Sequence, residues 1–376
     1  MQNCGMQGNV MFTNTRLISG SMLALALSCV SAEAQTQAPP SRNCQATRFT
    51  DGVGSTYNTC IAADMARLDT IYVPFVVQRM LARSFGFGPS TVEPTGLSGL
   101  TADEADARLG SSGLVIAPTA DTAAAAALSP LWNGWADGRY LHTDYTNAAG
   151  DLDGPTLTGM AGLDYKFNSK VSLGILVSAE TSDLASAVSD LSSSTYGVGP
   201  YLGIVLTDNI VFSANLLASH MNSSQMGGLL DFDTDRLQSS AALNGYWYKG
   251  TWRFTPGLTL AWSKDWESEN NGFLNDRTIE TGVLTPSFQL GNTLRLSDTT
   301  TVEPWAGAAL DWTFLSDVHT AGFGTVSDAS TDLRLQAGLN FGFGSNAQLA
   351  ITGEASGLLN KDLDSYSVEA NLAIQF

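Results

Sequence analysis

The sequence predicts an all-β protein: a transmembrane, antiparallel, up-and-down β-barrel of about 12 strands that follows a short, partly helical N-terminal extension. Three observations predict this fold. Apolar and polar residues alternate repeatedly from Trp132 to Phe376, and tight turns alternate there with longer polar connections. Only 14% of the residues are charged, against about 25% in an ordinary soluble protein. The barrel is therefore assigned to residues 131–376.

Residues 1–34 are predicted to be a signal peptide that directs Sec-dependent export and is then removed. An apolar run at 17–30 follows Arg16 and precedes an A-x-A sequence, so cleavage is expected before Gln35. This run is too short to span as a stable helix, and no other run approaches the roughly 20 apolar residues of a transmembrane helix. A membrane would therefore be crossed by strands.

Residues 35–130 show no sustained alternation and are rich in small residues, which predicts a short passenger or plug followed by a linker. A short helix is expected to begin at Pro74, because proline suits the first turn of a helix. Five consecutive alanines at 123–127 predict a second short helix, because alanine has the highest helix propensity. This second helix, next to the first strand, is the candidate for insertion into the barrel lumen.

Two cysteines, Cys44 and Cys60, remain after the expected cleavage site. In an exported chain they are expected to form one disulfide, which would close a loop of about 15 residues and stabilise the region by around 3 kcal/mol. Two free thiols are the alternative. A metal pair is less consistent with the sequence, because no histidine or third cysteine lies nearby.

Period-two alternation defines the strands, because only strand geometry puts successive side chains on opposite faces. In 251–263, for example, Trp252 and Phe254 share one face, while Arg253 and Thr255 share the other. Each strand thus has one apolar and one polar face, which suits a barrel with lipid outside and water inside. The strands with recognisable alternation include 171–180, 251–263, 301–314, 332–343, 349–357 and 365–376, and the alternation is least clear in the first strand, 132–145.

The connections between these strands alternate in length. Tight turns made of turn-forming residues stand at 168–170, 208–209, 249–250, 297–299 and 345–346. Longer polar connections are expected at 146–154, 182–194, 222–234, 267–276 and 319–330. Short periplasmic turns and longer extracellular loops are the expected topology of an outer-membrane barrel, and an even number of strands returns both barrel ends to the periplasm.

The last strand, 365–376, ends on an aromatic residue at the end of the sequence. It resembles the closing strand of bacterial outer-membrane β-barrels, whose C-terminal aromatic residue and alternating apolar positions are read by the barrel-assembly machinery. By this resemblance the assembly signal comprises Tyr366, Val368, Leu372, Ile374 and Phe376. The expected partners are the barrel-assembly machinery, periplasmic chaperones, outer-membrane lipid and lipopolysaccharide.

The segments LWNGWADGRY at 131–140, RLQAGLNFGFG at 334–344 and SYSVEANLAIQF at 365–376 resemble the translocator domain of autotransporters, the type V secretion family. The resemblance implies an outer-membrane pore filled by a linking helix, with an N-terminal passenger exported through or alongside it. The sequence departs from the family pattern, because only about a hundred residues precede the barrel and they show no repeat. The expected function is therefore a translocator or anchor for a short N-terminal segment.

Other functions are less consistent with the residues. A net charge of −18 disfavours nucleic-acid binding, because phosphates would be repelled. A small, porin-like channel is the alternative function. An outer-membrane enzyme is a further alternative, in which His142, His220 and His319 would lie near the extracellular rim, although no nucleophile motif accompanies them. The sequence therefore predicts a monomer with no catalytic, cofactor-binding or metal-binding residues.

Overall fold

The computed structural model of the protein describes residues 59–87 and most of 131–376. Within the second range, the residues outside the description are 148–149, 186–189, 226–229, 270–275, 321–323, 328, 345 and 361–362. The predicted signal peptide, Cys44 and the alanine run at 123–127 also lie outside the described residues, so those assignments stay predictions.

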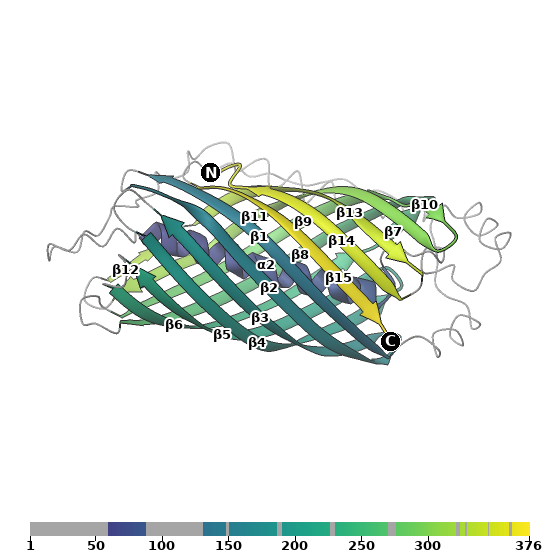
Figure 1. The fold of residues 1–376 in the computed structure, drawn as a ribbon, viewed down its shortest axis with the longest axis horizontal. Helices are drawn as coiled ribbons and strands as arrows, with labels where there is room; N and C mark the ends of the chain where they lie inside the picture. The colour runs from purple at the N-terminus through teal and green to yellow at the C-terminus, as the bar shows by residue number, and fades with distance from the viewer. Residues whose placement is uncertain are drawn as a thin grey trace, which may run out of the picture. The chain divides into compact units, whose positions relative to one another are not determined.

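Fifteen strand segments form one antiparallel sheet that closes into a barrel of 12 strands (Figure 1). The segments are β1 (Trp132–Asn147), β2 (Gly150–Asn168), β3 (Val171–Ala185), β4 (Asp190–Thr207), β5 (Ile210–Gln225), β6 (Leu230–Gly245), β7 (Trp247–Lys249), β8 (Trp252–Glu269), β9 (Arg277–Asn292), β10 (Leu294–Ser297), β11 (Thr300–Thr320), β12 (Gly324–Ser327), β13 (Ser330–Phe343), β14 (Ala347–Ser356) and β15 (Leu363–Gln375). Across short breaks, β7 extends β6, β10 extends β9, and β12 leads into β13. The predicted fold class and strand number are confirmed.

Pairing between the first and last strands closes the barrel. β1 and β15 pair in antiparallel register from Asn133, opposite Gln375, onward. The backbone N–H groups of Trp132 and Phe376 each donate to the other residue's carbonyl, at 3.1 and 3.0 Å. Because a closed sheet has no free edge, its backbone groups are paired even where lipid surrounds them.

The two faces of the strands differ as the alternation predicts. In β15, Glu369 and Asn371 are only 4% and 1% exposed, whereas Tyr366 and Val368 are both 55% exposed. Apolar side chains exposed in this way are unfavourable in water and favourable against lipid, at about 25 cal/mol per Å². The apolar face is therefore the membrane-facing surface, and the polar face lines the lumen.

The longer connections are mostly strand, which corrects the boundaries that the sequence predicts. The predicted connection 182–194 forms the paired ends of β3 and β4, where Asp183 lies opposite Ser192. The connection 222–234 likewise forms the paired ends of β5 and β6. Alternation ends there because strands that continue beyond the bilayer meet water on both faces. At the other end of the barrel, the five tight turns lie where the sequence predicts them.

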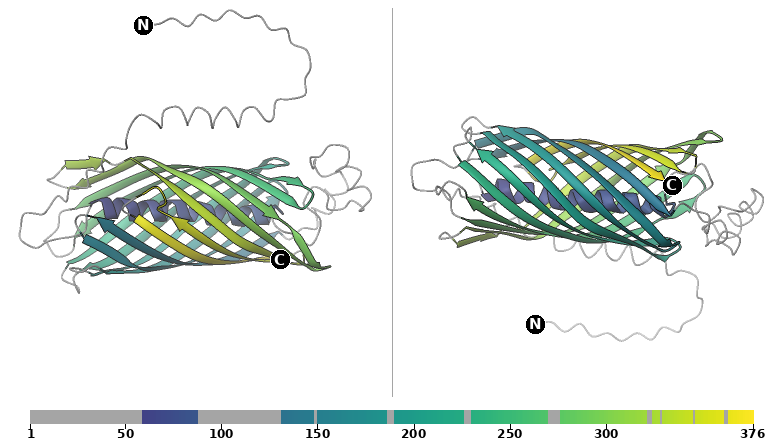
Figure 2. Two further views of the ribbon diagram at one scale, coloured as in Figure 1. Left: turned by 90° about the horizontal axis from the view of Figure 1, so that it is seen from above. Right: turned by 60° about the horizontal axis from the view of Figure 1, so that its bottom comes forward.

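The described residues include one helix, α2 (Thr59–Ser84), which lies inside the barrel (Figure 2). Pro74 is in its interior, so the prediction of a short helix that begins at Pro74 is wrong. Polar residues such as Asp64 and Arg67 are as buried as the apolar ones. The helix thus lacks the solvent-exposed polar face that marks a surface helix. No helix among the described residues is long and apolar enough for a membrane span.

Candidate functional site

The candidate functional site is the barrel lumen together with α2. Near one end of the barrel, Ala66 of α2 packs against Ile279, at the start of β9 where a longer connection lies. Near the other end, Phe87 stacks on Tyr246 with ring centroids 4.8 Å apart, close to the tight turn at 249–250. The helix therefore runs along the lumen with its N-terminus at the long-connection end and its C-terminus at the tight-turn end.

One side of α2 is apolar and packs against an apolar strip of the lumen wall. The helix contributes Val73, Val76, Val77, Met80 and Leu81, and β1 to β5 contribute Trp135, Met160, Leu176, Tyr201 and Leu217. At Gly203 of β4 the backbone leaves room for this contact. A Cβ there would lie 2.7 Å from Cδ2 of Leu81 and 2.8 Å from Cε2 of Phe85. The helix is thus seated against one wall of the barrel.

Replacing Gly203 by Val is expected to destabilise the seated helix by about 1–3 kcal/mol, because the added side chain overlaps Leu81 and Phe85. Combining it with Leu81→Ala should make the loss smaller than the sum of the two single losses, because the truncated side chain leaves space. The midpoint of denaturant-induced unfolding in detergent measures both effects. Strictly additive losses would show that position 203 does not contact the helix.

The barrel wall replaces the hydrogen bond that Pro74 removes from α2. Proline has no N–H, so the carbonyl of Thr70, four residues earlier, lacks its helical donor. Gln238 of β6 donates from Nε2 to that carbonyl at 2.8 Å. The Thr70 hydroxyl also lies 2.7 Å from the hydroxyl of Ser263 on β8. These bonds set the position of α2 along β6 and β8.

Gln238→Met is expected to destabilise the chain by about 1–3 kcal/mol, because the buried Thr70 carbonyl loses its donor while the side-chain volume is kept. In a chain that also carries Pro74→Ala the loss should be smaller, because a restored backbone N–H can bond the same carbonyl. A double-mutant cycle of unfolding free energies measures this coupling. Equal losses in the two backgrounds would contradict the role of the proline.

Buried ion pairs hold the N-terminal half of α2. Arg236 of β6 donates from one nitrogen to Asp69 of α2 at 2.6 Å, and from two others to Asp265 of β8 at 2.7 Å each. Two residues earlier in α2, Arg67 lies 3.4 Å from Asp332 of β13, and both side chains are buried. A buried charge that loses its partner is strongly unfavourable, so these pairs favour the seated helix.

Polar contacts continue through the middle of α2. The Tyr72 hydroxyl donates to the carboxylate of Asp137 on β1. The guanidinium of Arg139, two residues further along the same strand, lies 3.6 Å from the centre of the Tyr72 ring. This is the geometry of a cation–π contact, which is strengthened by burial. A single aromatic side chain thus binds two inward-facing residues of β1.

The last turns of α2 are hydrogen-bonded to the last two strands, β14 and β15. Arg79 donates to Glu369 of β15 and to the Thr352 hydroxyl of β14, the second at 2.9 Å. Arg83 donates to Asn371 of β15, and its own carbonyl accepts from Gln375 at 3.0 Å. The C-terminal strand therefore fixes the tight-turn end of the helix.

Asp164 of β2 connects the helix to the wall at this same end. Its carboxylate accepts hydrogen bonds from Ser84 of α2 at 3.0 Å and from Tyr201 of β4 at 2.9 Å. Asn133 and Ser172 donate to it at 2.8 and 2.7 Å. Because four donors converge on one buried carboxylate, its charge is well compensated, and it orders four different elements.

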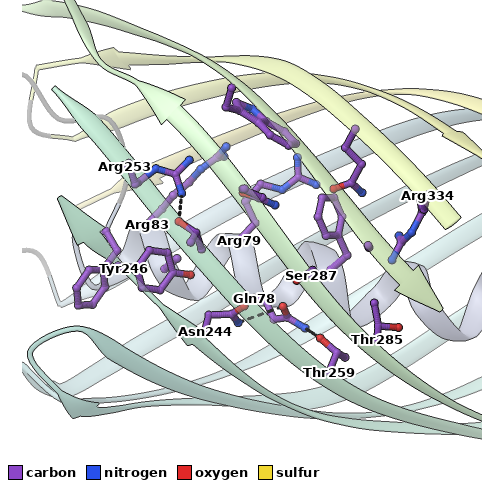
Figure 3. A pocket seen from close by; sticks show the side chains of 18 of the residues that line it. Gln78, Arg79, Arg83, Asn244, Tyr246, Arg253, Thr259, Thr285, Ser287 and Arg334 are labelled. Atoms are coloured by element: carbon purple, nitrogen blue, oxygen red, sulfur yellow. Dashed lines mark hydrogen bonds between the residues drawn. The ribbon is translucent and has the colours of Figure 1, made fainter. Parts of the chain in front are cut away.

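The opposite side of α2 leaves part of the lumen open. A cavity of about 80 Å³ lies between the helix and β6, β8, β9, β11 and β13, which is room for a few water molecules. Figure 3 shows Gln78 of α2 within this cavity, bonded to Asn244 at 3.1 Å and to Thr259 at 2.8 Å. The lumen thus has a filled side and a hydrated side.

The residues of the predicted assembly signal lie on the membrane-facing surface. Tyr366, Val368, Leu372, Ile374 and Phe376 are 43–65% exposed. Their outward position is compatible with recognition from the lipid side, and their role stays a prediction. The predicted disulfide also stays a prediction, because Cys44 lies outside the described residues and Cys60 is described only as a backbone position at the start of α2.

The three histidines weighed for an enzyme site lie on different strands. His142 is on β1, His220 is on β5 and His319 is on β11. Each has its own local partner; Nδ1 of His220 lies 2.8 Å from Asp235, and Nδ1 of His319 lies 3.1 Å from Thr325. Among the described residues, no group of three His, Cys, Asp or Glu side chains could hold a metal ion.

Sequence reasoning placed Arg79 and Arg83 on a short helix, with a basic contact to membrane or lumen as one alternative, but it missed Asp69 and the partners of all three residues. Asp69, Arg79 and Arg83 lie in a segment read as linker and short helix, and their partners are far away in the sequence. The sequence did contain one signal for such a helix, which is the charged residues on the lumen-facing side of the strands. A barrel with a polar lumen can accept a helix that carries buried charges. Inward-facing charged positions such as Asp137 and Glu369 mark the strands that such a helix would contact.

Comparison with known proteins places the fold in a family. Residues 134–354, more than half of the chain, match the model of the autotransporter beta-domain. No curated protein matches this sequence closely enough to suggest a relative.

Solved structures of other translocator barrels are similar to this chain in fold. The beta domain of the Bordetella autotransporter Brka has a TM-score of 0.53 at 16% identity, with 65% of this chain and 100% of that chain covered. The transport unit of the autotransporter AIDA-I from Escherichia coli has a TM-score of 0.49 at 13% identity, covering 65% and 90%. The translocator domain of the autotransporter NalP from Neisseria meningitidis has a TM-score of 0.48 at 14% identity, covering 73% and 96%. With its family match and its closed 12-stranded barrel, the chain belongs to the autotransporter beta-domain family and forms an outer-membrane translocator barrel.

Proposed function

We propose that this barrel exports the part of the chain that precedes α2 and then holds it at the cell surface, with α2 retained in the lumen as a plug. The observation that carries the proposal is the course of α2, whose two ends lie towards opposite ends of the barrel. A segment attached to the N-terminus of the helix is thereby directed out of the long-connection end.

The orientation follows from the turns. In outer-membrane barrels the short turns are periplasmic and the longer connections are extracellular. The C-terminus of α2 is at the tight-turn end, where the Arg83 carbonyl accepts from Gln375. Its N-terminal half approaches the long-connection end, where Arg67 lies beside Asp332. By this orientation, the chain before Thr59 emerges on the extracellular side.

Retention follows from the contacts of the helix. Withdrawal of α2 would separate charges that are buried or partly buried, such as Asp69 from Arg236 and Arg79 from Glu369, and would expose the apolar strip that packs on Leu81. Both changes are unfavourable. The seated helix is therefore the favoured end state once export is complete.

Export and assembly complete the proposal. The N-terminal apolar run supports Sec-dependent export with removal of residues 1–34. The outward apolar residues of the last strand, together with Phe376, support recognition by the barrel-assembly machinery and its chaperones. The apolar membrane-facing surface supports contact with lipid and lipopolysaccharide.

Protease treatment of intact cells tests the proposal. An epitope inserted after Gln35 should be lost on treatment with an impermeant protease. An epitope in the connection between β8 and β9 is the matched surface control, and one in the tight turn at 208–209 is the matched periplasmic control. The first control should be lost and the second protected.

The protected outcome would contradict the proposal. If the epitope after Gln35 survives on intact cells but is lost after the outer membrane is permeabilised, the segment before α2 is periplasmic and the helix enters from the other side. Loss of both control epitopes would mean that the membrane was breached, and the treatment is then repeated at lower protease concentration.

A further inference from the structure

The cavity beside α2 has a cationic lining. Its charged residues are Arg79 and Arg83 of α2, Arg253 of β8 and Arg334 of β13, and the described residues that line it include no aspartate or glutamate. The whole chain has 36 acidic residues against 18 basic ones. The charged side chains of the lining are thus positive, whereas the net charge of the protein is negative. Positive side chains gathered in one place attract anions.

Three of the four arginines are paired with carboxylates outside the cavity lining. The pairs are Arg253 with Glu303 at 2.7 Å, Arg334 with Asp311 at 3.2 Å, and Arg79 with Glu369. In each pair the arginine lines the cavity and the carboxylate does not belong to the lining. The cavity surface therefore stays cationic although most of these charges are compensated in the wall.

Arg83 differs from the other three, because its described hydrogen bonds go to neutral groups. Its guanidinium donates to the amide oxygen of Asn371 and, at 3.3 Å, to that of Asn340, and no ion pair among the described residues includes it. The residue is only 3% exposed. A buried guanidinium with amide partners alone is strongly unfavourable unless a counter-charge is present.

Two hydrogen-bond donors of the cavity lining have no acceptor among the described residues. Nε1 of Trp305 and Nε of Arg79 belong to lining residues, and both atoms are buried without a hydrogen-bond partner among the described residues. Both are obligatory donors that can bond only to an acceptor. A group that supplies both negative charge and acceptor lone pairs would satisfy them together with Arg83.

We propose that this cavity binds a small inorganic anion, chloride or phosphate, with Arg83 as its principal partner. The volume of about 80 Å³ is enough for a small ion with a few waters. Because Arg79 and Arg83 belong to α2, the site exists only while the helix is seated. Anion binding therefore stabilises the seated helix by linkage, a property separate from the export of the N-terminal segment.

The quadrupolar linewidth of chloride in the NMR spectrum tests the site in the purified full-length protein. The wild-type barrel should broaden the chloride signal, and Arg83→Gln should lose most of the excess broadening. Arg83→Lys should keep part of it, because the charge remains. Arg295→Gln is the matched control, because it removes a positive charge from β10, whose residues are all exposed, and should change little.

Phosphate at constant ionic strength distinguishes the two ions. Loss of the excess broadening on addition of phosphate assigns the site to oxyanions as well as halides, whereas unchanged broadening assigns it to chloride alone. Equal broadening by the wild type and by Arg83→Gln would overturn the proposal, because the chloride would then be bound only at the protein surface.

A second measurement covers the possibility that Arg83→Gln fails to fold. Replacing gluconate, an anion much bulkier than chloride, by chloride at constant ionic strength should raise the thermal unfolding midpoint of the wild type by about 2 °C or more. Trp305→Phe should reduce this rise, because it removes one donor and keeps every charge. The absence of any chloride-dependent rise in the wild type would overturn the proposal.

Discussion

Replacing Arg236 by Met is expected to destabilise the full-length barrel by about 3–5 kcal/mol. Arg236 lies between Asp69 of α2 and Asp265 of β8 and bonds both carboxylates at 2.6–2.7 Å. Methionine fills much of the volume, so the main effect is the loss of the cation between the buried carboxylate of Asp265 and the partly buried one of Asp69. The free energy of unfolding in detergent, measured by denaturant titration, gives the loss.

A truncated chain separates the contributions of the two carboxylates. In a variant without residues 59–87, Arg236→Met should be less destabilising, because only Asp265 is then left unpaired. Arg277→Met is the matched control; its partner Glu267 belongs to the neighbouring strand β8, at 2.7 Å, so its effect should be the same with and without α2. A loss at Arg236 that does not depend on α2 would contradict the assigned contact with Asp69.

The barrel itself could be predicted because a closed membrane sheet imposes a local pattern on its sequence. Each strand must alternate in polarity, as Glu369 and Asn371 do with Tyr366 and Val368, and this pattern is readable without any long-range information. Tight turns such as 208–209 are likewise set by local backbone preferences. Strand order then follows from sequence order, because each strand pairs with the next.

The plug could not be predicted in the same way, because its contacts are distant in the sequence. Asp69 and Arg236 are 167 residues apart, and nothing in the helix itself indicates which strand it meets. Pro74 also suggests a helix start, whereas in the barrel its missing N–H is compensated by Gln238.

The extracellular ends of the strands show a second reason why the sequence does not predict every feature of the fold. Beyond the bilayer both faces of a strand meet water, so residues such as Asp183 and Ser192 carry no alternation although they are paired. Hydrophobic periodicity reports the lipid-facing part of a strand, and it ends where lipid ends. The predicted connections were therefore too long at the end where polar strands continue.

Removing residues 59–87 is expected to turn a nearly closed barrel into a conducting pore. An α-helix with its side chains is about 10–12 Å across, so its removal should leave a water-filled passage of roughly that width within a barrel of 12 strands. The hydrated side that remains beside the seated helix is far narrower, with a cavity of about 80 Å³. Single-channel recordings in planar bilayers should show stable open levels for the truncated chain and little current for the full-length chain.

Variants that loosen the helix without removing it provide the sharper comparison. Arg236→Met removes the partner of Asp69, and Gln238→Met removes the partner of the Thr70 carbonyl. Each variant should show brief channel openings whose conductance equals that of the truncated chain. Arg277→Met, which leaves the helix contacts intact, should not. Equal conductance of the full-length and truncated chains would mean that α2 does not close the pore, and the lumen would then have to be regarded as a channel in its native state.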